Sequence, residues 1–220
     1  MRNALVCFML LLPLWVLAER IKTPDLTPAL TNQEEQAVID EGTALRDQAK
    51  YDEAITKFNQ VLEKSPNNDL AMYELASTYF SARKYEDALK ISYKGVHYKS
   101  RYLSKFYQFI GSSLDELGRS KDAINAFNEA LEVVPDNALI HFNLAAILIN
   151  SGKLAEAQPH LEKSIELNPT HSSSHYALSQ IYFSQNQEVP GILAILRFLS
   201  LEPQSKRSLK AITTLDEHLL

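Results

Sequence analysis

The stretch YQFIGSSLDELGRSKDAINAFNEALEVVP, residues Tyr107 to Pro135, decides the fold of this 220-residue chain. Apolar and small residues recur at helical spacing in its first half: Tyr107, Ile110, Gly111 and Leu114. After Gly118 a second helical period begins, with Ala123, Phe127 and Ala130, and Pro135 ends it. The stretch therefore predicts two antiparallel helices joined by a tight turn.

One small-residue position of this stretch returns along the whole chain. It falls at Ala54, Ala88, Ala123, Ala157 and Gly191, in steps of 34, 35, 34 and 34 residues. A second column contains Pro66, Pro135, Pro169 and Pro203, with Ser100 where a further proline is expected. A period of about 34 residues indicates helical hairpins stacked into a solenoid. The expected units are 35–68, 69–102, 104–137, 138–171 and 172–205, with Leu103 as an extra residue.

These columns resemble the tetratricopeptide repeat, whose pattern is W-x2-L-G-x2-Y, then A-x3-F, then P. The fourth unit carries the pattern as well as the third: His141, Leu144, Ala145, Leu148, Ala157, Leu161 and Pro169. The first and second units depart from it at several positions: Val38, Glu41, Ser92, Gly95 and Ser100. The resemblance covers about 170 residues. It implies an all-α, right-handed superhelical solenoid of five hairpins, whose first helices line a concave face that binds a protein or peptide.

The two ends of the chain predict different roles. Residues 1–18 combine Arg2 with an apolar run that closes at Ala18, a pattern typical of a cleaved signal peptide. An uncleaved anchor is the alternative, although the run is short and contains Pro13. Residues 19–34 are expected to form a linker. Residues 206–220 have helical apolar spacing and are expected to cap the last repeat, or else to begin a further module.

These features predict an exported protein, periplasmic or secreted, with no stable membrane span after cleavage. The simple signal and the lack of a usable glycosylation sequon favour a bacterial source. The only cysteine is Cys7, inside the predicted signal, so no disulfide framework is expected. Without residues 1–18 the chain has 21 basic residues (22 minus Arg2) against 27 acidic ones, a net charge of −6. This mildly acidic balance argues against a nucleic-acid partner.

A stretch of interleaved basic and aromatic residues, 93–107, coincides with the missing proline and the extra residue. Such a composition is used to bind single-stranded nucleic acid. Packing of a distorted junction explains it more simply, and a second protein-binding patch is a further alternative.

The sequence contains no pattern for catalysis or for cofactor or metal binding. It lacks a nucleophile with a base at a defensible spacing, a glycine-rich phosphate loop and a zinc pattern. His171 and His175 are four residues apart, a spacing that two metal ligands can use. However, His175 and His141 occupy the same aromatic position of successive repeats, so packing is the preferred interpretation. The chain is therefore expected to be neither an enzyme nor a metal or cofactor protein.

The binding residues follow from the register of the family. Two repeat positions, seven residues apart, lie on one face of each first helix, and both are occupied by apolar residues in three of the five repeats. With two neighbouring asparagines they form the predicted groove: Tyr73, Phe80, Phe142, Asn143, Ile149, Asn150, Tyr176 and Phe183. The asparagines are expected to bond a peptide backbone. The alternative is that the superhelix or the capping helix covers these residues. The family's clamp for a C-terminal carboxylate is not expected, because only Lys105 fits it.

The sequence therefore predicts a non-catalytic scaffold or adaptor for protein–protein interaction, which binds a peptide or a helix in its concave groove. The alternative is a structural subunit of a cell-envelope assembly or biogenesis complex. The partner and the oligomeric state are left open by the sequence.

Overall fold

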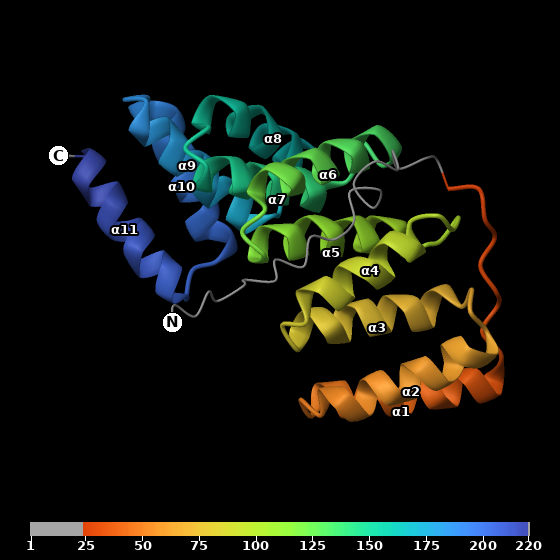
Figure 1. Ribbon diagram of the computed structural model, residues 1–220. Helices are drawn as coiled ribbons and strands as arrows, with labels where there is room; N and C mark the ends of the chain where they lie inside the picture. Colours follow the sequence, from red (N-terminus) through yellow and green to blue (C-terminus); the bar gives the residue numbers. More distant parts are fainter. Residues whose placement is uncertain (1–23, 220) are drawn as a thin grey trace, which may run out of the picture.

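The computed structural model describes residues 24–219, which form eleven α-helices and no strand (Figure 1). Ten helices make five hairpins: α1 (Gln33–Asp47) with α2 (Tyr51–Lys64), α3 (Asp69–Ser81) with α4 (Tyr85–Gly95), α5 (Leu103–Glu116) with α6 (Ser120–Val133), α7 (Ala138–Asn150) with α8 (Leu154–Leu167), and α9 (Ser172–Ser184) with α10 (Glu188–Leu201). Helix α11 (Lys206–Leu219) follows the fifth hairpin. The expected all-α solenoid is confirmed. The predicted signal peptide, residues 1–18, lies outside the described residues.

Each hairpin turns through one residue with a left-handed backbone. These residues are Ala49, Arg83, Gly118, Gly152 and Asn186, with φ of 59°, 57°, 73°, 74° and 57°. They occupy one register position, so the same turn is built five times. Glycine adopts this conformation without steric cost, whereas a side chain with a Cβ is strained there. The third and fourth turns therefore use glycine, the residue best suited to this conformation, whereas the first and second turns use Ala49 and Arg83.

Within each hairpin the two helices approach each other through residues of matched size. A Cβ added at Gly111 would lie 2.3 Å from ring carbons of Phe127, and one added at Gly42 would lie 2.7 Å from the Phe58 ring. In the other hairpins the same two register positions hold Ala76 with Ser92, Ala145 with Leu161, and Ser179 with Ile195. A phenylalanine therefore occurs only where its partner is glycine, which is how a core reaches uniform packing density.

Successive hairpins meet through a second matched pair. Gly95 of α4 faces Phe106 of α5, and a Cβ at Gly95 would lie 2.6 Å from that ring. At the next junction the pair is Ala130 and Ile140, both fully buried in the same apolar cluster. That cluster runs from Met72 to Ile181 without a break. Because each hairpin covers its neighbour's apolar face, the middle hairpins share one core, and two smaller clusters adjoin it at the α1–α2 end and at the α10–α11 end.

The segment that precedes α1 is attached to the stack. The Leu26 N–H donates to the His97 carbonyl at 3.1 Å, and the Lys99 N–H donates to the Leu26 carbonyl at 2.7 Å. Further along, the Ala29 N–H donates to the Asn67 carbonyl at 2.9 Å. The described part of the expected linker, residues 24–32, therefore lies along two inter-hairpin turns. One of them is the irregular turn that lacks a proline.

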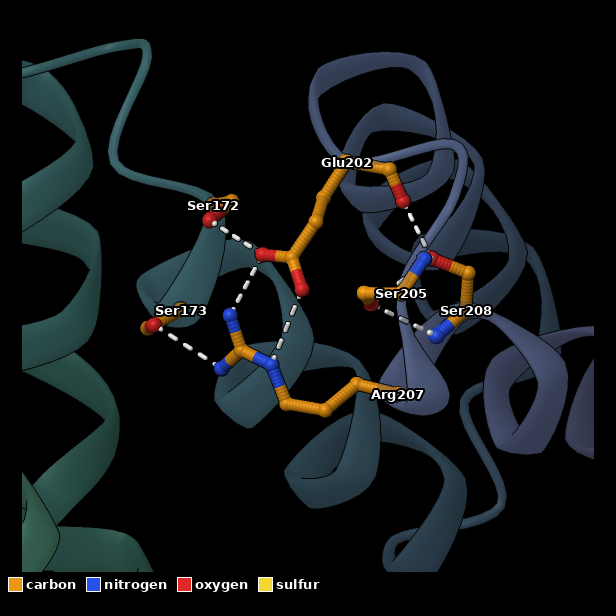
Figure 2. Close-up of polar contacts among 6 residues, drawn as sticks. All are labelled: Ser172, Ser173, Glu202, Ser205, Arg207 and Ser208. Carbon is orange, nitrogen blue, oxygen red and sulfur yellow. Dashed lines mark hydrogen bonds and ion pairs between the residues drawn. The ribbon is translucent and has the colours of Figure 1, made fainter.

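Polar contacts fix α11 against the fifth hairpin (Figure 2). The Arg207 guanidinium donates twice to the Glu202 carboxylate, once from Nε at 3.1 Å, and once to Ser173 Oγ at 3.0 Å. Ser172 Oγ also donates to Glu202 at 3.0 Å. The bonds from Arg207 are the main reason that the pKa of Glu202 falls to about 2. Ser205 and Ser208 exchange backbone-to-side-chain bonds, which cap the first turn of α11.

Candidate protein-binding face

The first helices of the hairpins line the inside of the curve. Helix α1 contacts α3, α3 contacts α5 and α5 contacts α7, whereas within residues 24–219 the second helices have no comparable contacts with one another. Helices that approach one another more closely lie on the shorter, inner path of a bent stack. The inner face is therefore built from α1, α3, α5 and α7, and α9 is the next first helix in the series.

Five half-buried aromatic side chains form a continuous cluster on and beside α3 and α5, here named the aromatic strip: Tyr73, Phe80, Tyr85, Tyr102 and Phe109. Tyr73 stacks on Tyr102 with ring centroids 4.6 Å apart and planes 7° from parallel. Phe109 lies between the two α3 rings, 6.2 Å from Tyr73 and 5.8 Å from Phe80. Phe80 also meets Tyr85 edge-on at 5.4 Å. The rings hold one another in place while part of each stays exposed.

Charged groups border the strip. Arg46 of α1 pairs with Glu74 of α3, and the Arg101 guanidinium lies 4.8 Å from the centre of the Tyr102 ring. Burial raises the pKa of Tyr73, so its hydroxyl stays neutral and can both donate and accept a hydrogen bond. The strip is thus an apolar surface with polar groups at its margin, the composition typical of sites that anchor a protein segment.

Further along the inner face, α7 and α9 contain no Asp, Glu, Lys or Arg. Phe142 and Ile149 are half-buried on α7, and Phe142 packs edge-on against His171 at 4.7 Å. Asn143 is half-buried and Asn150 is exposed, and neither side-chain amide bonds to another group of residues 24–219. These amides are therefore available to a ligand, and their bonding to a peptide backbone stays a prediction.

The prediction for Phe183 is wrong. Only 8% of this residue is exposed, and its ring stacks on His218 of α11 with centroids 3.9 Å apart. Gly191 allows the close approach, since a Cβ there would lie 2.5 Å from the Phe183 ring. Tyr176 is half-buried and packs on Phe198 at 4.9 Å. At Phe183 the capping helix therefore covers the predicted groove, which was the alternative interpretation, whereas Tyr73, Phe80, Phe142, Ile149 and Tyr176 keep part of their surface exposed.

Three members of the strip were not predicted from the sequence: Tyr85, Tyr102 and Phe109. Phe109 directly follows Gln108, the residue of α5 that corresponds to Tyr73 in the repeat register, and Tyr102 lies in the irregular junction. The basic and aromatic stretch 93–107 is largely used for packing. Phe106 and Tyr107 are fully buried, and burial raises the pKa of Tyr93 to about 12. The Tyr107 hydroxyl is buried without a hydrogen-bond partner among the described residues.

The histidines serve structural contacts. His141 Nε2 lies 3.0 Å from the Pro135 carbonyl, and His175 Nε2 lies 3.0 Å from the Pro169 carbonyl, so successive repeats use the same bond. Since a carbonyl only accepts, Nε2 of His141 carries the proton, and its Nδ1 accepts from His160 Nδ1 at 3.0 Å. Burial lowers the pKa of both His141 and His160, which keeps this pair neutral.

One hollow lies elsewhere. A depression of about 510 Å³ lies between α1 and α2 and is lined by Asn32, Glu35, Val38, Val61 and Ser65. Its lining contains no aromatic ring and several groups that already bond one another, such as Ser65 with Glu35. The aromatic strip is the stronger candidate because it offers apolar area and open polar groups together.

Within residues 24–219 no helix is both long and apolar enough to cross a membrane. Comparison of the sequence with protein families matches the tetratricopeptide repeat at residues 39–96 and again at 116–181. The chain belongs to the tetratricopeptide repeat family. Members of this family are scaffolds for protein–protein interaction and are generally non-catalytic.

Curated relatives share the repeats over part of their length. A TPR repeat-containing protein of Methanocaldococcus jannaschii is 27% identical over 128 residues, 58% of this chain and 22% of the relative. The Hsp70-Hsp90 organizing protein of Triticum aestivum is 25% identical over 181 residues, 80% of this chain and 30% of the relative. The chain thus spans less than a third of the length of these relatives.

Solved structures show the same fold. PilF of Pseudomonas aeruginosa superposes with a TM-score of 0.70 at 21% identity, covering 84% of this chain and 86% of that one. MamA gives a TM-score of 0.61 at 22% identity, covering 74% and 94%. YrrB, described as a TPR protein with an unusual peptide-binding site, gives 0.58 at 19% identity, covering 82% and 94%.

Proposed function

We propose that this chain is a non-catalytic scaffold that holds a segment of a partner protein along its inner face, on the aromatic strip and the uncharged surface of α7. The aromatic strip is the observation that carries the proposal. Its five rings contact one another and remain half-exposed, on the inner face or at its edge. Exposed aromatic area of this kind marks interaction sites in proteins.

The arrangement favours a preorganised binding site. The rings of Tyr73, Phe80 and Phe109 are fixed by one another, so a ligand does not have to order them, which improves affinity. The free amides of Asn143 and Asn150 add directional bonds to the backbone of an extended peptide or to the polar side of a helix. The absence of charged side chains from α7 and α9 favours a segment that is uncharged where it meets them.

We also propose that the scaffold acts in an exported compartment, periplasmic or secreted. The support is the pattern of residues 1–18, in which a charged start precedes a short apolar run and a small-residue cleavage position. Cell fractionation with N-terminal sequencing of the mature chain tests this. A mature chain that begins near Glu19 in the exported fraction supports it, and a cytosolic chain that keeps residue 1 refutes it.

Photocrosslinking tests the inner-face site. Ser77 lies between Tyr73 and Phe80 along α3, so a photoreactive amino acid there is expected to capture a partner. The same amino acid at Asn125, which is exposed on α6, is the matched control. Capture at Ser77 that is lost when Tyr73 and Phe109 are both changed to serine supports the site. Equal capture at both positions, or capture that survives the double change, refutes it.

A second candidate is a structural subunit of an envelope assembly. It is favoured by one observation, the concentration of exposed leucine, isoleucine and valine on α10 and α11. Because α11 covers Phe183, deleting this helix would also uncover core. Substitutions on the outward side of α11 therefore separate the two functions better, since they leave both the fold and the inner face intact.

A further inference from the structure

The outward surface of α10 and α11 is unusually apolar. Among the described residues eight large apolar side chains are exposed, and six of them lie on these two helices: Val189, Leu193, Leu196, Leu209, Ile212 and Leu219. Leu209 is 71% exposed and Leu193 is 64% exposed. Single exposed leucines are ordinary, but a concentration on adjacent helices marks an interaction surface.

Helix α11 occupies the place of the first helix of a sixth hairpin. It begins 34 residues after α9, and it contacts α10, although less extensively than α5 contacts α4. In this register Leu209 and Ile212 correspond to Met72 and Leu75 of α3, which are buried. Every complete repeat from the second onward buries these two positions, with α5 using Tyr107 and Ile110. The exposed row on α11 is therefore shaped to pack against a helix, and residues 24–219 supply none.

Helix α10, which contacts α11, carries exposed apolar residues of its own. The outward positions occupied by Val189 and Leu193 hold polar or small residues in the other second helices: Asp52 and Thr56, Glu86 and Lys90, Lys121 and Asn125, Ala155 and Pro159. These outward positions are therefore polar in three hairpins, small in the fourth, and occupied by larger aliphatic residues only in the fifth. A solvated surface alone does not require this change.

The charges of α11 indicate in which direction a helix packed on this row would run. Lys206, Lys210 and Glu217 fall on one stripe at helical spacing that flanks Leu209, with Ile212 further round the helix. None of the three forms an ion pair within residues 24–219. Lysines in the first turns and an acidic residue in the last turn also oppose the helix dipole, so α11 alone gains nothing from this arrangement.

An antiparallel copy of the same helix complements both features. In a two-fold antiparallel pair equivalent flanks face each other, so Lys210 of one copy comes beside Glu217 of its partner, and the reverse contact forms as well. The two apolar rows then cover each other. The opposed helix dipoles of the pair also place each set of charges near the end of the neighbouring helix that favours it.

We infer that this face is a self-association surface, on which α11 packs antiparallel against α11 of a second copy, with Leu193 and Leu196 of α10 at its margin. The polar contacts of Figure 2 hold α11 rigidly for this role, because Arg207 and Glu202 tie its start to α9 and α10. The helix has 14 residues and is about 21 Å long at 1.5 Å per residue, so the contact is small. The dimer is therefore weak and depends on concentration.

Sedimentation equilibrium of the mature chain from micromolar to millimolar concentration tests the inference. The wild type is expected to change from monomer to dimer over this range. Leu209→Glu with Ile212→Glu is expected to keep the chain monomeric, since four charges would meet in the contact. Leu30→Glu is the matched control, because Leu30 is 96% exposed and distant in sequence from α11. Circular dichroism should show unchanged helix content in both variants.

A charge exchange tests the antiparallel orientation. Two double variants are each expected to weaken self-association at least tenfold: Lys206→Glu with Lys210→Glu, and Glu217→Lys with Asp216→Lys, where Asp216 is the exposed acidic residue next to Glu217. A mixture of the two variants is expected to form heterodimers, because each restores the contacts that the other lacks. A wild type that stays monomeric at millimolar concentration overturns the inference. So does a dimer that is unaffected by the α11 changes, or an α11 face that captures only a different protein.

Discussion

Replacing Gly111 by alanine should destabilise the protein, although alanine is the better helix former. The added Cβ would lie 2.3 Å from two carbons of the Phe127 ring, more than an ångström inside an ordinary contact. That ring is fully buried, so it cannot move into solvent. Overpacking of this kind costs about 1–3 kcal/mol. The helix propensity of alanine returns about 1 kcal/mol. We therefore expect a net loss of up to about 2 kcal/mol in the free energy of unfolding.

A double-mutant cycle isolates the contact between the two side chains. In a Phe127→Leu background the ring is gone, and Gly111→Ala should then be neutral or should stabilise the chain by up to about 1 kcal/mol. The expected coupling is about 2 kcal/mol, and it is measured by urea unfolding followed by circular dichroism. The hairpin formed by α7 and α8 already has the compatible pair, Ala145 with Leu161, at these positions.

Additive effects would refute this reasoning. If Gly111→Ala changes stability equally in the presence and absence of the Phe127 ring, the glycine is not required by that contact. A stabilising effect in the wild-type background would also contradict it, because it would show that α5 and α6 separate at little cost.

Three further predictions concern single residues. Ala49→Gly should raise the free energy of unfolding by up to about 1 kcal/mol in urea melts, because Ala49 has a φ of 59° and glycine relieves that strain; a loss of stability would show that the turn is not strained. Tyr107→Phe should cost less than about 0.5 kcal/mol, since the buried hydroxyl has no partner among the described residues, and a larger loss would reveal one. Stability measured from pH 8 to pH 5 should be constant above about 6.5 and fall below it, because the unfolded histidines bind protons there while burial keeps the pKa of His141 and of His160 lower in the fold. His160→Gln should flatten this slope, and an unchanged slope would exclude the pair as its source.

The repeat architecture could be predicted from the sequence because it depends on local patterns. Helical spacing, turn residues and a constant period all act within one hairpin, and each hairpin contacts mainly its neighbours. The burial of Phe183 could not be predicted in this way, since it depends on where α11 docks. One signal was present: Gly191 replaces an alanine that recurs four times, and the space it leaves is filled by the Phe183 ring.

The candidate site depends on the one place where the repeat is irregular. At the start of α3 and α7, Asn68 and Asn137 bond the first turn of their own helix. Tyr102 holds that position before α5, and its side chain makes no such bond; the Ser100 hydroxyl accepts from its backbone instead. Losing an asparagine cap costs about 1 kcal/mol. In return the Tyr102 ring is free to stack on Tyr73, and it extends the aromatic strip from α3 to α5. The departure from the repeat pattern is thus explained by the exposed aromatic surface as well as by packing. Tyr102→Asn should therefore stabilise α5 and weaken the binding of any ligand held on the strip.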